Sequence, residues 1–237
     1  MATGLRILAT LRGLFSEAAL GPTTAAGGDH DPQWRGLVAV MVAGAAAYGA
    51  VLGGWHGWLL ALYSAIKLPL VLLVTASLTL PLAWIGASLL GLPLPVRRVA
   101  TVTFRSLGVA SVVLAALVPV AWLFTFSAPP PSPSARTAHN LLYLMHTTFT
   151  AGSGLAGTRA LWRGLRALAP SRATAAVVYL LWVTAFAVVG GEVAWALRPF
   201  VGSVYMPVVF LRKDALDGNV YEFIITDILP YLTGSLE

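Results

Sequence analysis

Residues 68–90 read LPLVLLVTASLTLPLAWIGASLL, and this stretch of 23 residues contains no charged side chain. An α-helix needs about 20 mainly apolar residues to cross the roughly 30 Å of hydrocarbon in a bilayer. The stretch therefore predicts a membrane-spanning helix, with Pro69 in its first turn and a kink at Pro81.

Four more stretches are also mainly apolar, namely residues 36–53, 107–126, 140–157 and 173–197, the last of which contains Glu192. Of the 237-residue chain, 58% is hydrophobic and 10% is charged, whereas an ordinary soluble domain has about 25% charged residues. A soluble fold cannot bury so much apolar surface. We therefore expect an all-α integral membrane protein with about five transmembrane helices over residues 36–197, in contact with the lipid bilayer.

Lysine and arginine residues gather on one side of the expected helices. Nine of them flank the helix ends that share a side with the N-terminus, and five flank the opposite ends. The positive-inside rule then predicts a multi-pass protein of the cell (inner) membrane, with a cytoplasmic N-terminus and an extracytoplasmic C-terminus. Because orientation explains the formal charge of +6, we expect no nucleic-acid partner.

Two segments outside the helices are expected to be ordered at the membrane surface. In residues 1–35, leucines fall on one side of a helical wheel and polar residues on the other, which predicts an interfacial amphipathic helix followed by a connector. Residues 198–237 form an extracytoplasmic tail whose apolar content needs a cover. We expect this tail to pack on residues 55–63 of its own chain or on another subunit. Its candidate docking residues are Phe210, Tyr221, Phe223 and Tyr231.

Aromatic residues mark the expected membrane interfaces. Trp55 and Trp58 lie between residues 54 and 67, a segment that we expect at the level of the lipid headgroups. Trp195 and Phe200 flank Arg198 as an interfacial anchor would, and Pro199 is expected to stop the last helix there.

Glycines mark expected helix contacts. Gly49 and Gly53 have the spacing that lets two membrane helices approach closely. Gly152, Gly154 and Gly157 match the pattern G-x-G-x-x-G, but they lie inside an apolar helix and arginines follow them. A dinucleotide site needs a preceding strand and a following acidic residue, so these glycines also predict helix packing.

Four ionisable residues near or within the apolar stretches are candidates for a structural or functional role. Glu192 is costly inside a membrane, and its expected depth matches that of Lys67, so we predict a hydrogen-bonded ion pair between them. The alternatives are a transport or gating role and simple exposure at the membrane interface. His139 and His146 lie seven residues apart on nearly the same helix face. They indicate polar contacts between helices, a proton or solute pathway, or a metal or pigment ligand.

The sequence lacks the common catalytic motifs. There is no cysteine, no H-E-x-x-H, no G-x-S-x-G and no pair of carboxylates within the apolar helices. The turn at Asp217 and Gly218 has the wrong ligand spacing for a calcium loop. We therefore expect no enzyme activity, no metal and no cofactor.

One short segment carries a resemblance. WALRPFVGS at residues 195–203, followed by Leu211-Arg212 and Gly218-Asn219, resembles the C-terminal end of a group of uncharacterised bacterial multi-pass membrane proteins. The five-span layout with a cytoplasmic N-terminus also resembles that of Yip1-type proteins. These resemblances imply a membrane location and no particular activity.

Two functions remain open on these observations. The first is a non-enzymatic, membrane-embedded subunit or scaffold of a larger assembly, with other membrane protein subunits as partners in a homo- or hetero-oligomer. The second is a channel or transporter whose polar pathway runs near Glu192, Lys67 and His146.

Overall fold

The computed structural model describes residues 33–203, 205, 207–223 and 225–226. The expected amphipathic helix at the N-terminus, Tyr231 and the side chain of Phe223 lie outside what is described.

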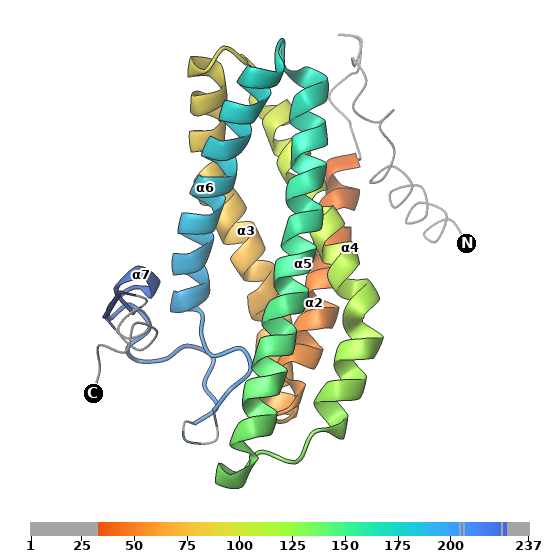
Figure 1. The fold of residues 1–237 in the computed structure, drawn as a ribbon, viewed down its shortest axis with the longest axis vertical. Helices are drawn as coiled ribbons and strands as arrows, with labels where there is room; N and C mark the ends of the chain where they lie inside the picture. Colours follow the sequence, from red (N-terminus) through yellow and green to blue (C-terminus); the bar gives the residue numbers. More distant parts are fainter. Residues whose placement is uncertain (1–32, 204, 206, 224, 227–237) are drawn as a thin grey trace.

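Five long helices run alternately up and down in one bundle (Figure 1). They are α2 (Gln33–Gly54), α3 (Trp58–Leu89), α4 (Val96–Ser127), α5 (Arg136–Leu168) and α6 (Arg172–Ala196). A short 3-10 helix, η2 (Pro133–Ala135), precedes α5, and a single turn, α7 (Val220–Phe223), follows α6. Each of the five predicted apolar stretches falls largely within one long helix. Four of these helices, α2, α3, α4 and α6, are long and apolar enough to cross a membrane.

Helix α3 begins at Trp58, ten residues before the predicted start of the helix at residue 68. The connection from α2 is a tight turn in which Gly57 has φ 123°, a conformation that side-chain-bearing residues rarely adopt. Trp58, Leu62 and Ile66 then recur every four residues on the exposed face of the helix, while Leu60 is buried. This amphipathic first part places Pro69 in the helix interior and not in its first turn.

Helix α5 is longer than predicted for a similar reason. Arg159, Arg163 and Arg166 continue the helix beyond residue 157, and all three are exposed. Their spacing of three or four residues keeps them on one face. Together with Arg97 and Arg172 near the starts of α4 and α6, they form what we call the arginine-rich end of the bundle, at the top of Figure 1.

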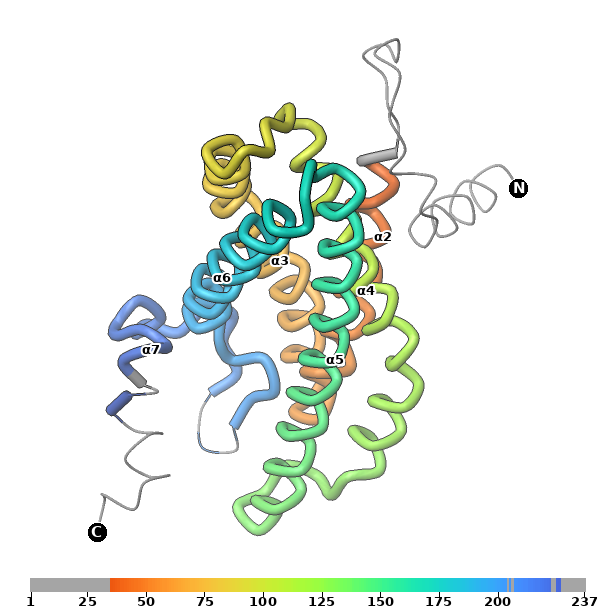
Figure 2. The backbone as a smooth tube through the Cα atoms, turned by 45° about the horizontal axis from the view of Figure 1, so that its top comes forward, coloured from red at the N-terminus to blue at the C-terminus, as the bar shows by residue number. Residues whose placement is uncertain are grey.

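Helix α2 packs between α3 and α4, and small residues make both contacts possible (Figure 2). A Cβ atom added at Gly49 would overlap the carbonyl of Ser64 in α3, and one at Gly53 would overlap the carbonyl of Leu60. Gly44 meets Ser111 of α4 in the same way. The predicted packing role of Gly49 and Gly53 is therefore confirmed.

The remaining helices are held together toward the arginine-rich end. A buried apolar cluster there joins α3, α4, α5 and α6, and it includes Ala87, Val99, Leu165 and Trp182. From the turn that joins them, α5 and α6 diverge along the bundle (Figures 1 and 2). A cavity lies between α3, α4, α5 and α6.

Candidate functional site

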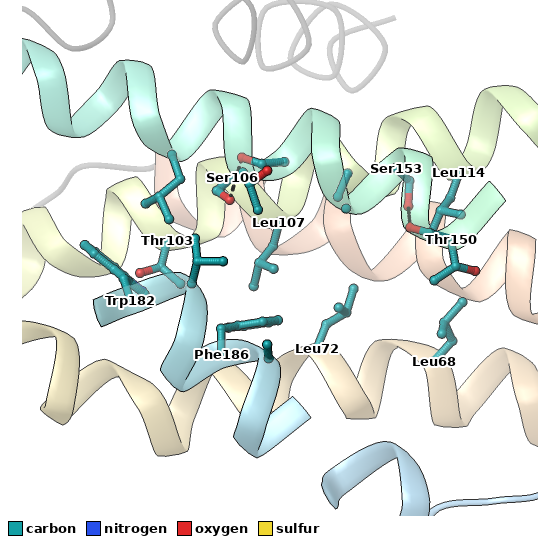
Figure 3. Close-up of a pocket in the computed structure, with 17 residues that line it drawn as sticks. Leu68, Leu72, Thr103, Ser106, Leu107, Leu114, Thr150, Ser153, Trp182 and Phe186 are labelled. Atoms are coloured by element: carbon teal, nitrogen blue, oxygen red, sulfur yellow. Dashed lines mark hydrogen bonds between the residues drawn. The ribbon is translucent and has the colours of Figure 1, made fainter. Parts of the chain in front are cut away.

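A cavity of about 280 Å³ occupies the space between α3, α4, α5 and α6. We call it the α3–α6 cavity, and Figure 3 shows its wall. Large apolar side chains of α3, α4 and α6 project into it: Leu68, Leu72, Leu107, Leu114, Trp182 and Phe186. The cavity lies next to the buried cluster, so its apolar walls belong to well-packed helices.

Helix α5 leaves room for the cavity because it contributes mostly small side chains. Thr150, Ser153 and Gly154 are its lining residues in the middle of the helix. A Cβ atom added at Gly154 would have no neighbour within 4 Å. A Cβ atom added at Gly157 would instead lie about 3 Å from Ser106 and Ala110 of α4. Helices α4 and α5 therefore touch at Gly157, and the cavity lies beside Gly154.

The hydroxyl groups in the wall are already engaged. Five threonine or serine residues line the cavity, and each donates a hydrogen bond to a backbone carbonyl at 2.7–3.0 Å. They are Thr103, Ser106, Thr150, Ser153 and Thr158. Because a hydroxyl has only one proton to donate, no lining hydroxyl keeps a free donor. The wall therefore offers no hydroxyl donor to an occupant, and most of its lining side chains are apolar.

The cavity opens between α5 and α6. Among its lining residues, only Thr150, Gly154 and Ala187 are exposed. The first two belong to α5 and the third to α6, on the side where these helices diverge. An occupant would therefore enter from the flank of the bundle, where the lipid chains of a membrane would lie.

His146 belongs to a closed polar network beside the cavity. Its Nδ1 lies 2.9 Å from the hydroxyl of Tyr48, and its Nε2 lies 3.3 Å from the hydroxyl of Thr125. A neutral ring with the proton on Nε2 accepts from Tyr48 and donates to Thr125, so both nitrogens are used. Tyr48 and His146 are buried. This geometry matches the expectation of a polar contact between helices.

His139 does not share a site with His146. Its Nε2 lies 3.0 Å from the Gly202 carbonyl, and its ring stacks on Trp55 with centroids 5.3 Å apart. Within the described part of the chain, no three His, Cys, Asp or Glu residues are grouped as a metal site would require.

Lys67 is completely buried, and the predicted ion pair with Glu192 is wrong. Its Nζ donates to the Pro199 carbonyl at 2.9 Å, and the ring centroids of Phe200 and Phe210 lie 5.8 and 5.2 Å away. No ion pair joins Lys67 and Glu192, both of which lie in described helices. The reason is that the chain turns back after α6 and brings its own carbonyl and aromatic rings to the ammonium group.

Glu192 lies instead beside the short helix α7. Tyr221 of α7 donates a hydrogen bond to the Val188 carbonyl at 2.8 Å. Burial, with a smaller contribution from the Glu192 carboxylate, raises the pKa of the Tyr221 phenol. Tyr221 is thus used within its own chain, although we predicted that it would face a partner.

The first part of the tail is attached to the bundle through its backbone. Four side chains of the bundle bind carbonyls between residues 199 and 203 of the tail: Lys67 binds Pro199, Ser64 binds Phe200, His139 binds Gly202 and His56 binds Ser203. Phe210 also packs edge-on against Tyr63, with centroids 5.3 Å apart. The tail therefore covers the end of α3 on its own chain, one of the two expected arrangements. Sequence reasoning missed Ser64 and His56, because nothing in the sequence pairs them with a backbone carbonyl far along the chain.

The expected interfacial anchors behave differently from one another. Trp58 is 78% exposed, as an anchor would be, whereas Trp55 is buried and donates to the Pro129 carbonyl at 2.9 Å. The Arg198 guanidinium stacks on the Trp195 ring at 3.7 Å and lies 3.8 Å from Asp214. Burial is the main cause that lowers the pKa of Arg198. Trp55 therefore packs inside its own chain, whereas Trp58 faces outward.

The three glycines of the G-x-G-x-x-G pattern also differ. Gly157 packs against α4 as predicted, whereas a Cβ atom at Gly152 or Gly154 would have no neighbour within 4 Å. The packing prediction is thus wrong within this chain for two of the three. Gly154 lines the α3–α6 cavity, and Gly152 is exposed outside it.

Comparison with protein-family models, curated proteins and solved structures finds no match to this chain. The resemblance of residues 195–203 to bacterial membrane proteins stays a prediction.

Proposed function

We propose that this chain is a non-enzymatic protein of the cell (inner) membrane that holds an apolar, lipid-soluble molecule in the α3–α6 cavity. The occupant we expect is a hydrocarbon or isoprenoid chain. All five long helices cross the membrane in this proposal, with the arginine-rich end in the cytoplasm. Helix α5 is more polar than the others, but Thr148, Thr150, Ser153 and Thr158 donate their hydroxyl protons to backbone carbonyls of α5 itself, which lowers the cost of placing them in a membrane.

The observation that carries this proposal is the chemistry of the cavity wall. Every lining hydroxyl already donates its proton to a carbonyl, so an occupant that needs hydrogen-bond donors would lose those of water on entry and find none in the wall. A hydrocarbon chain has no such cost. The volume of about 280 Å³ exceeds that of the roughly 150 Å³ apolar cavity that binds benzene.

A polar transport pathway is less well supported. His146 is enclosed by Tyr48 and Thr125, and Lys67 is enclosed by the tail. Neither residue lines the α3–α6 cavity. A channel would require these contacts to open.

A second candidate function, membership of a larger membrane assembly, is favoured by the outward face of α5. Five exposed residues recur there every three or four positions: Leu141, Leu144, Thr148, Gly152 and Leu155. A seam of this spacing with a glycine near its middle suits close contact with another membrane helix.

Two substitutions on α5 separate these functions. Gly154→Leu fills the cavity, so we expect native mass spectrometry of the protein in mild detergent to show loss of a co-purifying apolar molecule. Gly152→Leu adds the same side chain outside the cavity, so it should retain that molecule and instead disrupt assembly with other subunits. Equal retention by the wild type and Gly154→Leu would refute the cavity proposal. Unchanged assembly of Gly152→Leu would refute the second one.

A further inference from the structure

A second hollow, also of about 280 Å³, lies at the end of the bundle opposite the arginine-rich end. The loop before η2, the start of α5 and the tail enclose it. Its described lining residues are Ser132, Arg136, His139, Asn140, Ser203 and Tyr205. We call this hollow the polar pocket. All six side chains can donate a hydrogen bond, and none of the six is acidic.

Among these donors, His139 is used in a hydrogen bond within the chain, whereas Arg136 and Asn140 remain available to a ligand. The Nε2 of His139 is used by the Gly202 carbonyl at 3.0 Å, which holds the tail against α5 and closes one wall. Arg136 and Asn140 are exposed. Neither has a side-chain hydrogen bond or ion pair among the residues that the structure describes. The guanidinium and the amide are therefore free to bind a ligand together.

The charge at this place is unbalanced. Arg136 is the first residue of α5, a helix of 33 residues, and no side chain caps that helix end. The start of a helix carries partial positive charge from its free N–H groups, so a cation there is unfavourable unless an anion accompanies it. No described residue that lines the pocket supplies that anion.

We propose that the polar pocket binds a phosphate group. A phosphate offers several acceptor oxygens, which match the planar fork of Arg136 and the nearby amide and hydroxyl donors. The pocket also lies over Trp55, whose ring stacks on His139, and at the same end as the exposed Trp58. Exposed tryptophans favour the headgroup level of a membrane, where the phosphate of a phospholipid is found. Free inorganic phosphate shares this chemistry.

The test measures thermal unfolding of the full chain in a non-ionic detergent at constant ionic strength. Three probes are titrated separately: dioctanoyl phosphatidylglycerol, inorganic phosphate and dioctanoylglycerol, which lacks phosphate. We expect the phospholipid to raise the unfolding temperature by more than dioctanoylglycerol does, because the chains of either probe can enter the α3–α6 cavity but only the phospholipid has a phosphate for the polar pocket. This extra stabilisation by the phospholipid, with none by inorganic phosphate, identifies a lipid headgroup as the source. Stabilisation by inorganic phosphate as well shows that the phosphate group is sufficient.

Two variants tie the effect to the pocket. Arg136→Gln removes the free guanidinium from an exposed position, so the chain should still fold and bind the effective probe about tenfold more weakly, as for loss of one charged hydrogen bond. Lys213→Gln removes the same charge from an exposed site on the tail outside the pocket, and binding should not change. The proposal is overturned if no phosphate probe stabilises the protein, if dioctanoylglycerol acts equally, or if both variants weaken binding alike.

Discussion

Replacing Gly49 with alanine tests the contact between α2 and α3 most directly. The added Cβ would overlap the Ser64 carbonyl, which is backbone and cannot rotate away, so the two helices must separate. Overpacking of this kind costs about 1–3 kcal/mol. Alanine also favours a helix over glycine by about 1 kcal/mol, which masks part of this cost.

The matched control is Gly152→Ala in α5, where an added Cβ has no neighbour within 4 Å. Both variants gain the same helix propensity, so their difference in unfolding free energy isolates the overlap. We expect Gly152→Ala to be the more stable of the two by about 1–3 kcal/mol. Titration with sodium dodecyl sulfate in mixed micelles, followed by circular dichroism, measures this difference. Equal unfolding midpoints would show that α2 and α3 do not touch at Gly49.

Three further predictions concern the tail and the orientation of the chain, which has no natural cysteine. Lys67→Met removes the hydrogen bond to the tail, worth about 1.5–3 kcal/mol for a charged donor, so a spin label at Leu211→Cys should become more mobile; an unchanged spectrum would contradict the attachment. The hydrogen bond from Arg212 lowers the pKa of the Asp214 carboxyl. The contribution of this hydrogen bond to folding is therefore fully present above pH 3.9, about the pKa of an aspartate in the unfolded chain. It is lost as the pH falls through the lower pKa that Asp214 has in the folded chain. The same label should stay immobile from neutral pH to about 5 and gain mobility only below about 4, and Asp214→Asn should remove that pH dependence. Finally, an impermeant thiol reagent applied to intact cells should label Ser134→Cys and leave Ser171→Cys unlabelled; the reverse result would invert the proposed orientation.

The behaviour of Gly152, Gly154 and Gly157 illustrates what can be predicted for the site. All three lie in one apolar helix, which the sequence indicates correctly. Successive residues of an α-helix are rotated by about 100°, so glycines two and three positions apart face different surroundings. Gly157 meets α4, Gly154 lines the cavity and Gly152 is exposed. Which of them packs depends on where the neighbouring helices lie.

The sequence alone determined where the long helices lie, because an uncharged apolar run forms a helix that satisfies its own backbone. It also determined the close approach of α2 through Gly49 and Gly53, since a missing side chain is a local property. The partner of Lys67, the burial of Trp55 and the α3–α6 cavity were decided only by the tertiary structure. Each depends on segments far apart in the chain: the tail returns to α3, the Pro129 carbonyl meets Trp55, and α5 diverges from α6. A local sequence pattern cannot predict these contacts, because they depend on how whole helices pack against one another.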